Sequence, residues 1–235
     1  MVEMTGGPCG PVRRNFQESR IMIVYGATLS PFVRKVLVYG AERGLGLESK
    51  VLGLGSTDPD FRAASPFGKI PGFRDGDFAI SDSTAIVTYL EAKYPDGGLI
   101  PAEAAARART IWYDEFADTI LSAAGGKVFF NRFVAAMIGR QPDMAAADAA
   151  IRDELPPLFD YLEGVIPDSG HLVGDALTLA DISVASPFAN LAYCDVHVDA
   201  ARHPRLAAFV AAMHGRDSFA ALIAADRAFL ARMAG

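Results

Sequence analysis

The hydrophobic and polar positions divide the chain into a first part with short strands and a longer part made of helices. Residues 21–25 form a brief apolar, β-branched run that is typical of a buried strand. Apolar side chains recur three and four positions apart over residues 31–41, which predicts a helix. Residues 51–54 predict a second strand. Segments 71–74 and 77–80 flank an Asp-Gly pair and predict a hairpin.

A further helix is predicted over residues 83–93, where Pro95 and the glycines after it stop the pattern. The order of elements is therefore βαβ followed by ββα. A βαβ unit implies parallel strands joined by a crossover helix, and a hairpin adds antiparallel strands. This order predicts a thioredoxin-like α/β domain over residues 21–96.

Alanine becomes abundant after Pro101 and strand signals vanish, so residues 97–102 are predicted to be a linker and 103–235 an all-α domain. Helices are expected over 103–124 and over 127–137. A third helical face runs from Ile151 to Ile166, and its Pro156-Pro157 pair should start, bend or break a helix. The fold class is thus α/β plus all-α.

Residues 1–20 mix glycine, proline and polar residues without apolar periodicity and predict a flexible tail. They contain no apolar central region, so they do not resemble a secretory signal.

Composition excludes several classes of protein. Half of the 235 residues are hydrophobic, which predicts a sizeable core, and no apolar run reaches the length of a membrane span. The net charge of −6 argues against a nucleic-acid partner. Two cysteines, Cys9 and Cys194, favour a reducing cytoplasm over a secreted disulfide scaffold. The four histidines show no ligand spacing, so no metal site is expected.

The stretch from Ser65 to Tyr89 carries the most chemistry. Its turn can expose a backbone N–H and C=O at Ile70-Pro71 to an extended ligand. Asp82-Ser83 open the next helix, where a carboxylate, a hydroxyl and unpaired N–H groups come together. These groups suit a small peptide-like anion.

The run Pro66-Phe67-Gly68-Lys69-Ile70-Pro71, followed by Asp82-Ser83, resembles the glutathione-binding half of the cytosolic glutathione transferases. The resemblance extends over roughly residues 21 to 220. It implies a cytoplasmic homodimer that uses glutathione as co-substrate, with a cis Pro71 in the turn. Many relatives have Glu at the position of Asp82, one methylene longer.

The resemblance also implies roles for single residues. Ile70 would pair with the cysteinyl backbone of glutathione, Ser83 would bind the γ-glutamyl carboxylate, and Asp82 would meet the α-amino group. Lys69 could reach a glutathione carboxylate or stay solvated, and Arg62 is a candidate for the glycine carboxylate.

Glutathione must lose its thiol proton to act as a nucleophile, and lowering a thiol pKa from about 8.5 by two units requires roughly 3 kcal/mol. Ser30 opens the first helix within the motif Tyr25-Gly-Ala-Thr-Leu-Ser30-Pro. The motif is similar to that of the serine-type transferases, and the resemblance implies a bacterial member of this type. Ser30 could instead only cap the helix. Tyr25 is the rival catalytic hydroxyl, or a core aromatic, and Thr28 is a weaker candidate.

The helical part contains two further motifs, an aromatic set and a helix cap. Tyr113 and Phe116 belong to an aromatic set that could form a wall for the second substrate, although such stripes usually belong to a core. Thr178 and Asp181 form a capping box with a structural role, similar to the box that opens a buried helix in glutathione transferases. The leading interpretation is a glutathione transferase that attacks a small hydrophobic electrophile. The alternative is a non-catalytic binding or scaffold protein of the same fold.

Overall fold

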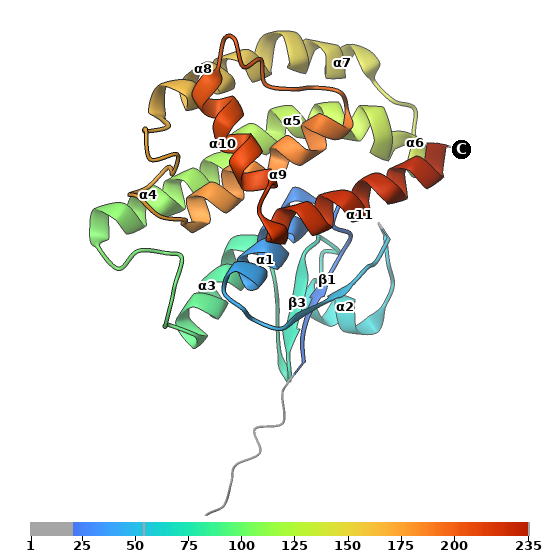
Figure 1. Ribbon diagram of the computed structural model, residues 1–235. Coiled ribbons are helices and arrows are strands. Elements are labelled where there is room, and N and C mark those ends of the chain that lie inside the picture. Colours follow the sequence, from blue (N-terminus) through green and yellow to red (C-terminus); the bar gives the residue numbers. More distant parts are fainter. Residues whose placement is uncertain (1–20, 54, 235) are drawn as a thin grey trace, which may run out of the picture.

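A four-stranded sheet forms the centre of the N-terminal part (Figure 1). The computed structural model describes residues 21–53 and 55–234, so the predicted tail over residues 1–20, with Cys9, lies outside the described residues. The sheet has the strand order β2-β1-β3-β4, with β1 and β2 parallel and the other two pairs antiparallel. The strands are β1 (Met22–Tyr25), β2 (Leu47–Lys50), β3 (Gly72–Asp75) and β4 (Phe78–Ser81).

Helices cover both faces of this sheet, which confirms the thioredoxin-like arrangement. Alternate residues of β1 point to opposite faces. Val24 packs in the main core with α1 (Pro31–Glu42) and α3 (Ser83–Lys93). On the other face Tyr25 packs with Phe61 of α2 (Pro59–Ala64).

Two strand predictions need correction. The second strand was expected over 51–54, but β2 spans Leu47–Lys50, and residues 51–53 have no regular structure. β2 is a mostly exposed edge strand with the sequence Leu-Glu-Ser-Lys, so the apolar signal pointed to the wrong residues. Leu47 is held against α1, where a Cβ on Gly40 would lie 2.3 Å from its side chain. The hairpin forms one residue later than predicted.

The C-terminal part is all-helical, as predicted. Helices were expected over 103–124 and 127–137, but one unbroken helical run covers 104–137. Gly125 and Gly126, which suggested a break, lie inside it, and Gly125 lets Leu191 pack closely. The run comprises α4 (Ala104–Glu115), the π-helical η1 (Phe116–Leu121), α5 (Ser122–Phe129), the π-helical η2 (Phe130–Val134) and α6 (Ala135–Met137).

A second helical run includes the proline pair. Pro156 and Pro157 lie in the first turn of α8, directly after a π-helical segment, and the helical run continues through them. The remaining elements are α7 (Met144–Ala149), the π-helical η3 (Ala150–Glu154), α8 (Leu155–Val165), α9 (Leu179–Tyr193), α10 (Pro204–His214) and α11 (Asp217–Ala234).

Helix α9 is the central element of the helical part and is buried along almost its whole length. It packs against α4, α5 and α10, and also against α1, so it joins the two parts of the chain. α11 lies along α1 as well (Figure 1). No single helix of the described residues is long and apolar enough to cross a membrane; α10 and α11 pass such a test only together, and they meet at an 85° bend.

A capping box starts α9. Thr178 takes the N-cap position, and the carboxylate of Asp181 accepts hydrogen bonds from the Thr178 N–H at 2.8 Å and from the Leu172 N–H at 2.7 Å. Asp181 is fully buried, and burial raises the pKa of its carboxyl group, while these hydrogen bonds oppose that change.

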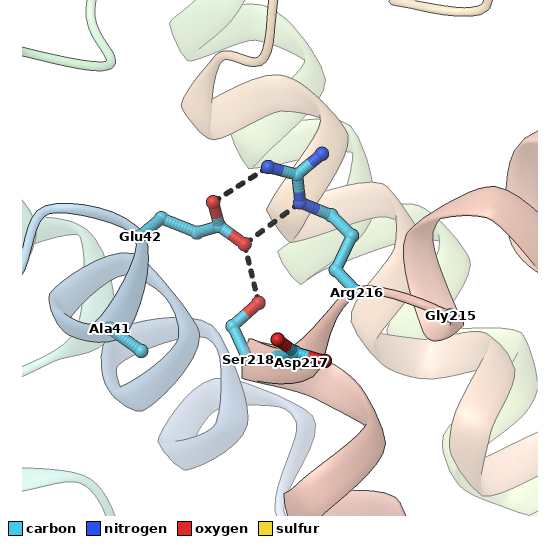
Figure 2. A pocket seen from close by; sticks show the side chains of 6 residues that line it. All are labelled: Ala41, Glu42, Gly215, Arg216, Asp217 and Ser218. Atoms are coloured by element: carbon cyan, nitrogen blue, oxygen red, sulfur yellow. Dashed lines mark hydrogen bonds and ion pairs between the residues drawn. The ribbon is translucent and has the colours of Figure 1, made fainter.

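An ion pair joins the end of α1 to the start of α11 (Figure 2). The Arg216 guanidinium donates two hydrogen bonds to Glu42, at 2.8 and 2.7 Å, and the Ser218 hydroxyl adds a third at 2.5 Å. The hydrogen bonds from Arg216 hold the pKa of Glu42 below its ordinary value of 4.5. A carboxyl group with a lowered pKa stabilises the fold above its ordinary pKa, and this contribution is lost as the pH falls through the lowered value.

We therefore expect Glu42→Gln to destabilise the protein by about 1 kcal/mol at neutral pH, because a partly exposed bidentate pair is lost. The difference from the wild type should shrink as the pH falls through the lowered pKa of Glu42, where the native carboxyl group also becomes protonated. Thermal melts of both proteins across this range test the prediction. Glu154→Gln, which removes the exposed pair with Lys127, is the control and should change little at any pH. A Glu42→Gln effect that does not depend on pH would contradict the assignment.

Candidate functional site

The strand register brings three predicted site segments to one edge of the sheet. Tyr25 ends β1 and pairs with Gly72, the first residue of β3. Gly72 in turn pairs with Ser81, the last residue of β4. Since neighbouring strands lie about 4.8 Å apart, the loop after β1, the turn before β3 and the start of α3 leave the sheet side by side.

The loop after β1 carries Ser30 and packs against the turn before β3. Gly26 has a φ of +137°, and a Cβ there would lie 2.9 Å from the Cβ of Ile70, so only glycine fits. The Ile70–Pro71 peptide bond is cis, as the resemblance implied. Ser30 is the N-cap of α1, and its Oγ lies 3.4 Å from the Val33 N–H. That distance is long for a hydrogen bond, so the cap is weak.

The turn before β3 presents backbone and basic groups. The N–H and C=O of Ile70 take no part in the loop and turn hydrogen bonds of the described residues. The buried Ser65 hydroxyl donates to the Lys69 carbonyl at 2.6 Å and fixes the turn, while the Lys69 side chain is exposed. Arg62 lies against Gly68 and donates to the Ser56 carbonyl at 2.9 Å.

Asp82 and Ser83 open α3 with different roles in the helix. Asp82 is the N-cap, and its carboxylate accepts from the Ala85 N–H at 3.0 Å. Its φ of +86° is unusual for a residue with a side chain and costs on the order of 1–3 kcal/mol. Ser83 follows in the first turn, where its N–H has no partner within the helix. Strained residues of this kind gather at ligand sites.

A buried charged cluster lies behind Ser83. The Ser83 hydroxyl is 3.2 Å from Asp118, and the ammonium of Lys35 lies 2.7 Å from Asp118 and 2.7 Å from Asp114. Thr84 also donates to Asp114, at 2.7 Å. Burial raises the pKa of Asp118, and the charge of Lys35 opposes this change. The cluster connects the start of α3 to α1 and η1.

The two candidate catalytic hydroxyl groups have different surroundings. Tyr25 is 1% exposed and packs against Phe61 beneath α2, with ring centroids 6.3 Å apart. Ser30 is half-buried at the site edge. The weaker candidate, Thr28, donates its hydroxyl proton to the carboxylate of Asp226 on α11. Its only hydroxyl proton is therefore used within the protein.

The expected wall residues lie in the core. Tyr113 and Phe116 are 3% and 5% exposed, and burial raises the pKa of Tyr113 to about 12. Trp112 is 48% exposed and stacks on Phe116. Of these three neighbouring aromatic side chains, Tyr113 and Phe116 face inward and Trp112 faces outward.

Other reactive groups take no part in these contacts. Cys194 is buried, and burial raises the pKa of its thiol to about 12, so it is a poor nucleophile. Among the described residues, no group of three or more histidine, cysteine or acidic side chains could hold a metal ion. A groove of about 670 Å³ lies at the junction of α1 and α11, and it is lined by Ala41, Glu42, Gly215, Arg216, Asp217 and Ser218.

The charged residues behind the site were missed by sequence reasoning. Arg34 and Lys35 follow each other in α1 and are both buried, each against aspartates of the helical part. A charged residue requires a partner only where it is buried, and two adjacent basic residues interrupt the apolar face of this helix. The interruption is a weak signal of buried ion pairs, and it does not identify the partners.

Comparison with known proteins agrees with this geometry. Residues 24–98 match the family "Glutathione S-transferase, N-terminal domain", and residues 129–226 match "Glutathione S-transferase, C-terminal domain". Glutathione S-transferase 3 of Zea mays is 34% identical over 167 residues, which cover 69% of this chain and 74% of that protein. The chain belongs to the glutathione S-transferase family.

Solved structures of the family share the whole architecture. A glutathione S-transferase from Rhodospirillum rubrum superposes with a TM-score of 0.78 at 28% identity, covering 86% of this chain and 91% of that one. One from Methylobacterium radiotolerans, in complex with glutathione sulfonate, has a TM-score of 0.70 at 26% identity and covers 86% and 94%.

Proposed function

We propose that this protein is a serine-type glutathione transferase, in which Ser30 stabilises the glutathione thiolate for attack on a small hydrophobic electrophile. The observation that carries the proposal is that the loop carrying Ser30, the Ile70–Pro71 turn and the Asp82–Ser83 helix start leave the sheet at one edge. A hydroxyl at a helix N-terminus favours an adjacent anion through its hydrogen bond and the helix dipole.

Each segment supplies one part of glutathione recognition in this proposal. Ile70 pairs with the cysteinyl backbone, and the Ser83 N–H and hydroxyl bind the γ-glutamyl carboxylate. Asp82 meets the α-amino group, and Lys69 reaches a carboxylate. The relative from Methylobacterium radiotolerans, which holds a glutathione derivative, supports this ligand class. The burial of Tyr25 supports Ser30 as the catalytic hydroxyl.

We further propose a cytoplasmic homodimer. Phe67, 90% exposed within the site turn, offers an apolar contact that a second subunit would cover. Low cysteine content supports a reducing compartment.

Tyr113 and Phe116 lie in the core, whereas Trp112 is exposed. Trp112 is therefore a better candidate than those two residues for contact with a partner or a substrate.

Glutathione binding measured by calorimetry tests the proposed function, and Ser83→Ala is the sharpest variant. The Ser83 hydroxyl also donates to Asp118, which keeps Lys35 as a second partner. The loss of glutathione affinity in Ser83→Ala should therefore lie at the low end of the range for a hydrogen bond to a charged group. We expect affinity to fall about tenfold, or about 1.5 kcal/mol.

Thr88→Ala provides the matched control, because Thr88 is an exposed residue farther along the same helix. It should bind glutathione as the wild type does. Unchanged affinity in Ser83→Ala would remove Ser83 from the site. A wild type that does not bind glutathione would instead support a non-catalytic role.

A further inference from the structure

A buried polar cluster between α1, α9 and α11 contacts the loop that carries Ser30. Its centre is the ion pair between Arg34 of α1 and Asp226 of α11, with 2.8 Å between Nη2 and Oδ2. Both side chains are buried, at 0% and 2% exposed. The Tyr193 hydroxyl, from α9, donates to the same Asp226 oxygen at 3.0 Å.

The cluster forms hydrogen bonds with two successive residues of the loop. Thr28 donates its hydroxyl proton to the other oxygen of Asp226. The amide of Asn190 donates to the Leu29 carbonyl at 2.7 Å, while its oxygen accepts from Arg34 at 2.8 Å. Arg34 is fixed in turn by the Ser186 carbonyl at 2.8 Å. Residues 28 and 29, directly before Ser30, are therefore tied to α9 and α11.

This arrangement does more than join α1 to α11. The ion pair of Glu42 with Arg216, and the Ser218 hydroxyl, connect the same two helices near the other end of α1 (Figure 2). That second connection does not touch the loop. The contacts of Thr28 and Leu29, in contrast, hold the two residues directly before Ser30.

Ser30 has a fixed backbone, since its N–H donates to the Ala27 carbonyl at 3.0 Å and its carbonyl accepts from the Arg34 N–H at 3.0 Å, but its side chain is weakly held. Its Oγ is 3.4 Å from the Val33 N–H, and its hydroxyl proton has no acceptor among the described residues. A free hydroxyl proton can stabilise a thiolate only when the backbone holds it within hydrogen-bond distance.

We propose that Asp226 is a positioning residue, which acts through Thr28 to place Ser30 against the glutathione thiol. This inference rests on the proposed function of Ser30. It assigns to the last helix of the chain a part in thiol activation without contact with glutathione. It also assigns Thr28 to loop support instead of catalysis.

The test compares Thr28→Val, Thr28→Ser and Asp226→Asn with the wild type. Thr28→Val removes the hydroxyl at nearly constant shape, and we expect it to raise the pKa of bound glutathione by about half a unit to one unit. We expect kcat with a chromogenic aryl halide to fall about three- to tenfold, with KM for glutathione changed less than about twofold, because orientation is lost while binding contacts remain. Thr28→Ser should restore both values.

Asp226→Asn should change the thiol pKa in the same direction, and the double variant should change it no more than the larger single effect. Ser218→Ala is the control, since it weakens the other α1–α11 contact and should leave the thiol pKa unchanged. Thr28→Val leaves the Arg34–Asp226 ion pair in place. If Asp226→Asn is too unstable to purify, the comparison of Thr28→Val with the wild type is therefore the test.

Hydrogen exchange of a peptide over residues 26–33 gives a readout that does not depend on glutathione. It should be faster in Thr28→Val and unchanged in Ser218→Ala. Unchanged exchange in Thr28→Val would overturn the positioning role. So would a thiol pKa that rises in Thr28→Val but not in Asp226→Asn, because Thr28 would then act on the thiol directly. A wild type without a thiolate signal would remove the proposed function, and the link to thiol activation with it.

Discussion

Ser30→Ala should raise the pKa of bound glutathione by one to two units and lower turnover at neutral pH by about 10- to 100-fold. One hydrogen bond to a charged group contributes about 1.5–3 kcal/mol. Since one pKa unit corresponds to about 1.4 kcal/mol, this contribution equals roughly one to two units. The affinity for glutathione should change less, because Ile70 and Ser83 hold other parts of the peptide. Thiolate absorbance in the ultraviolet, followed against pH, measures the shift.

Two variants separate catalysis from helix capping. Ser30→Gly keeps the N-cap nearly as stable, since glycine costs only a few tenths of a kcal/mol there. It should nevertheless lose activity as Ser30→Ala does. Tyr25→Phe removes the rival hydroxyl while its ring stays against Phe61, and it should leave the thiol pKa unchanged.

The outcome that would contradict this assignment is a large pKa shift in Tyr25→Phe with none in Ser30→Ala. The protein would then use a tyrosine to activate the thiol. A wild type that binds glutathione without a thiolate signal would point to a binding protein that kept the fold.

Local signals predicted the parts of the fold that local chemistry determines. Ser30-Pro31 marked the start of α1, because a capping hydroxyl followed by proline suits the first turn of a helix. The range of α3, Ser83–Lys93, was predicted correctly for a similar reason, with a polar pair at its start and a proline after its end. The turn before β3 was found from its motif and family resemblance.

Long-range contacts decide what the sequence pattern could not reveal. β2 is an exposed edge strand whose position depends on pairing with β1, and its polar residues give no apolar signal. Arg34 and Asp226 are 192 positions apart, and their pairing appears only after α11 has packed along α1. The burial of Tyr113 and Phe116 also depends on neighbouring helices.

Asp181→Ala should be among the most destabilising single substitutions in the helical part. It leaves the N–H groups of Leu172 and Thr178 buried without an acceptor. An N-cap contributes about 0.5–2 kcal/mol and each hydrogen bond to a charged group about 1.5–3 kcal/mol, partly offset by the cost of burying the carboxylate. We expect a net loss of about 2–4 kcal/mol, which for a chain of this size lowers Tm by about 5–15 °C.

Asp143→Ala is the matched control for this loss. Asp143 caps α7 through the Ala146 N–H at 2.9 Å, but it is exposed, so water can replace it. Its removal should cost at most about 1 kcal/mol. Because Asp181 lies in the core at the start of α9, glutathione binding should survive in Asp181→Ala well below its Tm. A variant with the melting temperature of the wild type and no glutathione binding would place Asp181 in the site instead of the helix cap.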